Sequence, residues 1–259
     1  MQPTDACTRL LQPLIVWLQT ASVGSAAAAM LLLNVLICLG GLVGGALLLR
    51  LFPSRRVALP PPPVQRRELA YVVATVVLNS VVTGAGLWLW RRGVIVFRTD
   101  CGLRAWLDVP LLLLMMDVAM YGLHRVAHLP LLYPLLHAEH HRYVHPRPLT
   151  LFVLHPLETL GFGGLWLVVI SLYSSSWLGM SVYLACNVVY GIIGHLGVEP
   201  MPPSVLQVPI LRALSTSTFH AQHHQDPQHN FGFYLVLWDR LLGTLSPRYQ
   251  RDFGRLPSP

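Results

Sequence analysis

Charged side chains are scarce in this chain. Only 11% of its 259 residues are Asp, Glu, Lys or Arg, whereas soluble domains carry about 25%. Hydrophobic residues make up 54% of the chain, and the mean hydropathy is +0.54. This shortage of charge excludes an ordinary soluble domain and predicts an integral membrane protein.

Lysine is absent, so all 18 basic residues are arginine and the net charge is +7. No compact basic run with interleaved aromatic residues suggests nucleic-acid binding. In a membrane protein, positive charge reflects topology and contact with anionic headgroups. We interpret the exclusive use of arginine as coding bias of a GC-rich genome, which favours a bacterial inner membrane over the endoplasmic reticulum.

Cysteine is rare and scattered. The four cysteines are Cys7, Cys38, Cys101 and Cys186, and no two have CxxC spacing. This distribution argues against a disulfide framework and against a thiolate metal site.

Long apolar segments define the expected fold. Residues 21–49 carry no charge and are long enough to span a bilayer. Further spans are expected at 69–90 and 105–123, and four consecutive prolines at 60–63 exclude a helix between the first two. Residues 159–194 are uncharged and break at three serines, 174–176, which predicts a helical hairpin.

The fold class predicted is therefore all-α: a polytopic membrane helical bundle of about four spans, or three plus a hairpin. We expect residues 1–123 to form N-terminal membrane spans and residues 124–259 to form a catalytic region that includes the hairpin 157–194. An even number of crossings separates loop 50–68 from segment 124–148, so both lie on one side of the membrane. The arginines of loop 50–68 predict that this side is cytoplasmic.

No histidine occurs before residue 124, and nine of the twelve in the chain lie in four short motifs. The motif HRVAH places two at i and i+4, the motifs HAEHH and HAQHH each place three at i, i+3 and i+4, and GHLG adds one. Such positions share a helix face, so each cluster can direct its imidazoles to one point. The candidate catalytic and metal-ligating residues are His124, His128, His137, His140, His141, His195, His220, His223 and His224.

Imidazole suits Fe, Zn, Cu and Ni. Nine imidazoles exceed the ligand number of one metal but fit two. Carboxylates are few near the clusters, and Asp117, Asp226 and Asp239 are expected to accept hydrogen bonds from the imidazole N–H groups. Asp117 and Tyr121 lie on one helical stripe with His124 and His128, so this stripe is expected to run into the site.

The three motifs HRVAH, HAEHH and HAQHH resemble the histidine boxes of the fatty acid hydroxylase/sterol desaturase superfamily of integral-membrane di-iron oxygenases. The stretches FVLHPLE and HNFGFYLVLWDRLLGTL also look like segments of that family. The resemblance covers about residues 115–247 and is nearest to members of the C5-sterol-desaturase type. It implies an enzyme of lipid metabolism that binds two iron ions and takes O2 as co-substrate. It also implies oxidation of an unactivated C–H bond, giving a hydroxylated (monooxygenase) or a desaturated product.

What the resemblance implies about substrate and electron supply is less specific. Sterol-like or other isoprenoid lipids and fatty acyl lipids are both expected substrates from the bilayer. No HPGG haem motif is present, so electrons are expected from a separate donor: cytochrome b5, ferredoxin or a reductase. Some relatives have a further histidine where this chain has Gly191, which leaves open whether His155 or water completes the metal shell.

Alternative functions remain open at this point. A membrane zinc-dependent hydrolase would require an HExxH motif, in which Glu directly follows the first His. In HAEHH, Glu139 lies two residues after the first His. A metal carrier or channel would want polar residues within the spans. The histidines could instead form a pH-sensing cluster that binds no metal. A degenerate protein without enzyme activity is the remaining alternative.

Overall fold

The computed structural model describes residues 6–256 and contains helices and isolated bridges, with no extended strand in that range. The helices are α1 (Ala6–Thr20), α2 (Val23–Leu51), α3 (Arg66–Arg91), α4 (Leu103–Ala127), α5 (Tyr133–Leu136), α6 (Ala138–His141), η1 (Pro148–Phe152), α7 (Pro156–Leu172), α8 (Trp177–Gly194), η2 (Pro203–Gln207), η3 (Leu211–Ala213), α9 (Ser217–Gln225) and α10 (Leu237–Leu241). The prediction of an all-α fold is confirmed.

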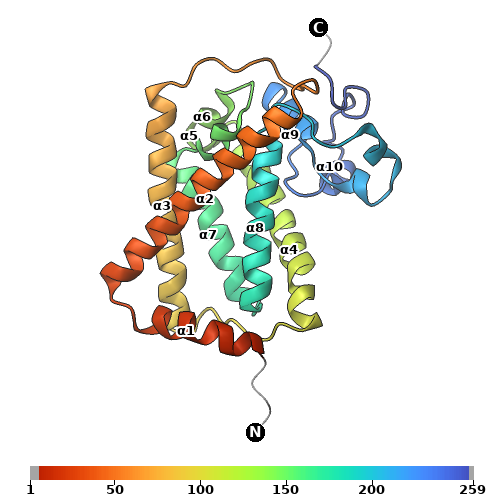
Figure 1. The fold of residues 1–259 in the computed structure, drawn as a ribbon. Helices are drawn as coiled ribbons and strands as arrows, with labels where there is room; N and C mark the ends of the chain where they lie inside the picture. The colour runs from red at the N-terminus through yellow and green to blue at the C-terminus, as the bar shows by residue number, and fades with distance from the viewer. Residues whose placement is uncertain (1–5, 257–259) are drawn as a thin grey trace.

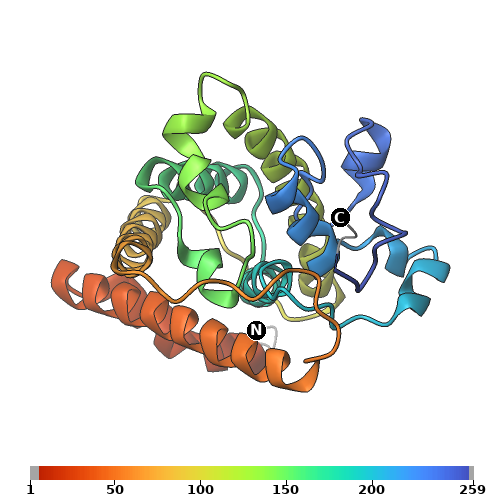
Figure 2. The same cartoon turned by 90° about the horizontal axis from the view of Figure 1, so that it is seen from above.

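Four helices of the described chain are long and apolar enough to cross a membrane: α2, α3, α4 and α8. A fifth apolar helix, α7, has 17 residues and packs among them. Figure 1 shows these helices as a bundle, with the short helices α5, α6, α9 and α10 at one end and α1 lying across the other. Seen from above, α3 and α8 are nearly end-on, while α2 runs obliquely along one side (Figure 2). The chain is thus a polytopic helical bundle with a cap.

The hairpin predicted from the serine break is α7 and α8. Ser176 begins α8 because its hydroxyl accepts a hydrogen bond from the Gly179 N–H. The tip of the hairpin is held by the buried Asp108 of α4, which accepts from the Tyr173 hydroxyl at 2.6 Å and from the Ser176 N–H at 2.7 Å. Arg98 pairs with the same carboxylate at 2.9 Å. The hairpin therefore returns to the cap, where α7 began.

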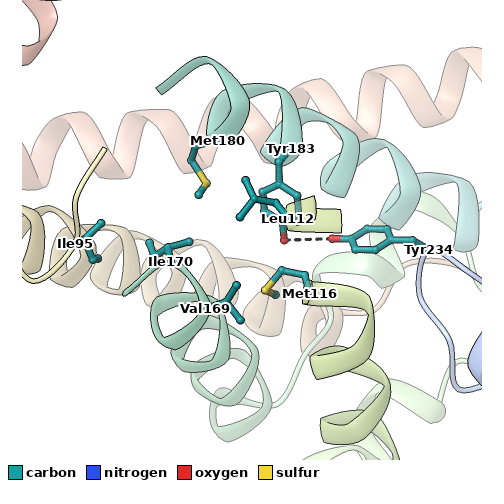
Figure 3. Packing of buried hydrophobic residues seen from close by; sticks show 8 residues of the cluster. All are labelled: Ile95, Leu112, Met116, Val169, Ile170, Met180, Tyr183 and Tyr234. Carbon is teal, nitrogen blue, oxygen red and sulfur yellow. Dashed lines mark hydrogen bonds between the residues drawn. The ribbon is translucent and has the colours of Figure 1, made fainter. Parts of the chain in front are cut away.

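Apolar packing between α4, α7 and α8 forms the core of the bundle (Figure 3). Leu112 and Met116 of α4 meet Val169 and Ile170 of α7 in this cluster. Close approach requires small residues: a Cβ at Gly163 would lie 2.7 Å from the Val82 side chain, so α7 can contact α3 only with glycine there. This cluster holds α4, α7 and α8 together. It therefore sets the positions from which these helices lead into the cap.

The cap is built from the segments between and after the spans. Its segment 201–253 has a small core of its own, which includes Phe219, Val236 and Tyr249. Cys38 and Cys186 are free, but Cys101 is disulfide-bonded, which the scattered cysteine spacing failed to predict. Helix α4 is continuous through the boundary expected between residues 123 and 124.

Candidate metal centre

The cap brings all nine candidate histidines together in two adjacent groups. The first holds His124, His128, His137, His141 and His223, and the second holds His140, His195, His220 and His224. Within each group the ring nitrogens that could bind a metal all lie within 4.8 Å of one another. The two groups adjoin, since the rings of His141 and His224 are stacked with centroids 4.9 Å apart.

Local structure explains how neighbouring histidines serve different groups. In α6 the motif HAEHH directs His137 and His141 to the first group and His140 to the second. In α9 the motif HAQHH directs His223 to the first group, while His220 and His224 go to the second. Each short helix therefore contributes to both groups, and the i, i+3, i+4 spacing divides between two centres instead of converging on one.

Backbone carbonyls fix the orientation of two imidazoles in the second group. The Nδ1–H of His140 donates to the Val153 carbonyl at 3.1 Å, and that of His195 donates to the Gly191 carbonyl at 2.8 Å. A carbonyl only accepts, so Nδ1 carries the proton and Nε2 presents a lone pair. The two Nε2 atoms lie 3.2 Å apart. Two lone pairs at this distance repel each other unless a cation lies between them.

The first group repeats this arrangement. The Nδ1–H of His124 donates to the Phe231 carbonyl at 2.8 Å, and the Nδ1 of His137 contacts the Glu158 carboxylate at 2.6 Å. Their Nε2 atoms lie 3.0 Å apart. Two ligands at right angles on a metal with bonds of about 2.1 Å are separated by about 3 Å. The spacing of the imidazoles therefore fits coordination in both groups.

Burial keeps these imidazoles neutral. It lowers the pKa of His195 to about 4 and, together with the neighbouring His124, that of His128 to about 3. The pKa values of His140 and His223 also lie well below that of free histidine, chiefly because of burial. The neutral form is the one that binds metals. The buried Nε2 of His128 has no hydrogen-bond partner among the described residues, as expected of a ligand atom.

The three aspartates expected to orient the candidate ligands contact none of the nine candidate histidines. Asp117 accepts from the backbone N–H of Tyr234 at 2.7 Å and from the indole N–H of Trp238 at 2.7 Å. It therefore ties the C-terminal segment to α4. The prediction that Asp117 supports an imidazole was wrong, because backbone N–H groups and the Trp238 indole N–H bind this carboxylate.

Asp226 and Asp239 also bind other groups. Asp226 contacts the Nδ1 of His229, which belongs to neither histidine group. Asp239 accepts from the backbone N–H groups of Phe231 and Gly232 at 2.8 Å each. Since the Phe231 carbonyl accepts from His124, Asp239 acts on the site only by shaping this turn. Neither aspartate contacts a candidate ligand, which corrects the sequence-based expectation for both.

The carboxylate that does contact a candidate ligand is Glu158. It is 4% exposed, and its second carboxylate oxygen has no partner among the described residues. From the sequence, Glu158 was not expected to support an imidazole. The signal available was its position in the first turn of an otherwise uncharged apolar helix, where a buried carboxylate needs a partner.

Two further expectations concern the shell of the second group. The ring of His155 caps α7, with its Nδ1 accepting from the Leu157 N–H at 3.3 Å, and His155 belongs to neither group. At Gly191 a Cβ would lie 2.8 Å from the Leu151 side chain. A larger residue there would therefore need Leu151 to move.

Glu139, the acid within HAEHH, is directed away from the histidines. Its carboxylate pairs with Arg67 of α3, with Nε to Oε1 at 2.8 Å. The pair joins the cap to the bundle and leaves Glu139 without the position that a general base of a zinc hydrolase would need.

A cavity of about 310 Å³ leads from the bundle to the histidines. Its walls come from α2, α3, α4, α7 and α8, and they include His124 and His137 of the first group and His140, His195 and His220 of the second. The cavity therefore reaches both groups from within the membrane-spanning part of the chain. A lipid in the bundle could present a carbon atom to both centres.

Comparisons with known proteins agree with this architecture. A family model described as fatty acid hydroxylase matches residues 109–244, just over half of the chain. The chain is 35% identical to a very-long-chain aldehyde decarbonylase of Oryza sativa subsp. indica over 48% of its own length and 21% of that protein. It is 29% identical to the lathosterol oxidase of Homo sapiens, over 69% of its own length and 60% of that protein.

A third relative is methylsterol monooxygenase 1 of Gallus gallus, with 30% identity over 49% of this chain and 42% of the relative. The chain thus matches less than two thirds of the length of these curated relatives. No solved structure matches the chain.

Proposed function

Because this chain belongs to the fatty acid hydroxylase/sterol desaturase superfamily, we propose that it is an O2-dependent oxidoreductase that hydroxylates or desaturates a lipid. It is an integral membrane protein. The relatives named as lathosterol oxidase and methylsterol monooxygenase support a sterol-like or other isoprenoid substrate, with fatty acyl lipids as the second class.

One observation carries the proposal: two groups of neutral imidazoles with their Nε2 lone pairs about 3 Å apart, at the end of an apolar cavity. We assign the five-histidine and four-histidine groups as the holders of two iron ions. Bound there, the ions would supply the activation of O2 that oxidation of an unactivated C–H bond requires.

The protein's own residues would bind the substrate and orient the imidazoles. The carbonyls of Val153, Gly191 and Phe231 and the carboxylate of Glu158 hold imidazole rings with their Nε2 atoms inward. The apolar walls of the cavity exclude water and place the substrate carbon beside both groups. The same walls admit a substrate directly from the bilayer.

The electron supply and location follow as parts of the proposal. Electrons come from a separate donor: a cytochrome b5, a ferredoxin or a reductase. The cap faces the cytoplasm, and the membrane is the bacterial inner membrane. We also propose that residues 1–123 serve mainly as membrane spans and residues 124–259 as the catalytic region.

Lipid analysis of a host with and without the gene tests the function. We expect a product heavier by one oxygen atom or lighter by two hydrogen atoms, formed only when O2 is present. A host that carries His223→Ala should lack this product while the variant still inserts into the membrane. An unchanged lipid profile on expression of the intact chain, with metal bound and a reductant supplied, would contradict the proposal.

The zinc-hydrolase alternative is disfavoured by one contact. The ion pair between Glu139 and Arg67 removes the acidic side chain that such an enzyme would use as a base. A single zinc per chain together with hydrolytic activity would reinstate that alternative.

A further inference from the structure

The walls of the cavity carry polar side chains at the depth of the membrane-spanning helices. Asn79 lines it from α3, Trp166 from α7 and Asn187 from α8. A hydrocarbon tail would satisfy none of these groups. Inside a membrane, a polar group without a hydrogen-bond partner raises the free energy considerably.

Three of these hydrogen-bonding groups lack partners within the described chain. The Asn79 amide makes no side-chain hydrogen bond, and the buried indole N–H of Trp166 has no acceptor. Asn187 accepts from the Tyr234 hydroxyl at 2.6 Å through its oxygen, but its NH2 group donates to nothing. By contrast, Asn34 of the same cavity donates to the Met30 carbonyl at 2.9 Å. The three unpartnered groups thus differ from the Asn34 amide, which has a hydrogen-bond acceptor within the protein.

Helix register gives the depth of these groups below the histidines. Asn187 lies eight residues before His195 on α8, which corresponds to about 12 Å along the axis. Thr75 and Thr159 are 3.4 Å apart and align α3 with α7. Asn79 is one turn beyond Thr75, about 6 Å further from the cap. The polar groups therefore form a band on three sides of one cavity, with Asn187 about 12 Å below His195 and Asn79 about 6 Å below the level of Thr75.

The hydrogen-bonding groups of the band indicate which ligand atom would bind there. Trp166 can only donate, and Asn187 has only its NH2 group left to donate, whereas Asn79 can donate and accept. An excess of donors calls for an acceptor oxygen. We propose, on the basis of the proposed function, that the substrate is a lipid whose deeply buried end carries a hydroxyl or carbonyl oxygen. This oxygen would lie on the order of 10 Å from the carbon that is oxidised.

Such a substrate would enter with an oxygen at its inner end. A plain fatty acyl chain would instead place its hydrocarbon tail against Asn79 and Asn187 and leave their amides unpaired. The band therefore favours an oxygenated isoprenoid, or another lipid with oxygen at both ends, over a simple acyl chain. It also sets which carbon reaches the histidines, because the buried oxygen fixes how far the molecule extends toward the cap.

Equilibrium binding to the intact chain in phosphatidylcholine nanodiscs tests this inference without turnover. The probes are radiolabelled dodecanediol, with a hydroxyl at each end, and dodecanol, with one. Two additional hydrogen bonds predict that the diol binds about tenfold more tightly. Asn79→Leu and Asn187→Leu should each reduce this preference and leave dodecanol binding unchanged. Leu184→Met, on the cavity wall formed by α8, is the matched control and should retain the preference.

Trp166→Phe removes the indole N–H and keeps an aromatic ring, and it should also reduce the preference. Equal binding of the two probes to the unmodified protein would overturn the inference, as would a preference that survives in both asparagine variants. A diol preference in a protein that oxidises no lipid would instead contradict the proposed function alone. Oxidation of lipid without a diol preference would contradict only the inference about the cavity.

Discussion

Replacement of Glu158 by glutamine should weaken metal binding in one group of histidines and spare the other. Glu158 Oε1 lies 2.6 Å from His137 Nδ1, and the carboxylate is almost fully buried. Glutamine keeps the size of the side chain but offers a single amide oxygen, a weaker acceptor than a carboxylate, to hold the proton on Nδ1. His137 then loses basicity at Nε2 and can rotate or change tautomer.

The magnitude follows from comparable contacts. Loss of a group that orients a metal-binding imidazole typically reduces metal affinity by about 10–100-fold, or about 1.4–2.7 kcal/mol. Only the five-histidine group should be affected. In the four-histidine group, His140 and His195 are held by backbone carbonyls, which the substitution does not alter. In Glu158→Gln, the four-histidine group should therefore still bind its ion strongly, whereas the five-histidine group should bind its ion weakly.

Titration of the iron-loaded protein with a competing chelator, followed by metal analysis, measures this difference. We expect the variant to release about one of its two ions at chelator concentrations that leave the unmodified protein loaded. The matched control is Glu139→Gln, a buried carboxylate of the same cap that pairs with Arg67 and contacts no histidine. Equal weakening of both ions in Glu158→Gln, or no weakening at all, would refute this account of how His137 is held.

Four further predictions follow from single contacts. His223→Ala removes an imidazole whose Nε2 lies 3.1 Å from that of His141 and should lower product formation at least about 100-fold with normal membrane insertion, as measured by product analysis. His155→Ala should retain both ions and cost no more than about 1 kcal/mol in thermal unfolding, because its ring caps α7; loss of an ion would return His155 to the shell. Asp117→Asn places an amide N–H against donors and should destabilise the protein by about 2–3 kcal/mol in denaturant unfolding; an unchanged unfolding midpoint would contradict that role. Burial lowers the pKa of His195 from 6.5 to about 4, so its contribution to metal-free stability is complete above pH 6.5 and is lost as the pH falls toward 4, which thermal unfolding across that range would detect.

The bundle itself was predictable because hydrophobic length and proline placement are local properties. The uncharged run 159–194 with its serine break gave the hairpin, since Ser176 can cap a helix and a run of this length can cross twice only if it turns. The histidine spacing predicted that the imidazoles of each motif would share one helix face and point to a common site. It did not predict how they divide, because His137 and His140 of one motif serve different groups.

The residues that orient the imidazoles could not be read from sequence. Most of them are backbone carbonyls, such as those of Val153 and Gly191, and a carbonyl has no sequence signature. The aspartates were expected in this role because they are scarce and close in sequence, but the open N–H groups of the turn at 231–235 bind Asp117 and Asp239 instead. The polar band in the cavity was also not predicted. Asn79 and Asn187 are far apart in sequence and line one cavity only in the folded bundle.

The metal content of the chain purified without a histidine tag tests the central claim most directly. If two groups of neutral imidazoles each hold an ion, elemental analysis should find two irons per chain, and loss of either group by substitution should remove one. A single metal per chain, or an unchanged metal content after His140 and His195 are both replaced by alanine, would contradict it.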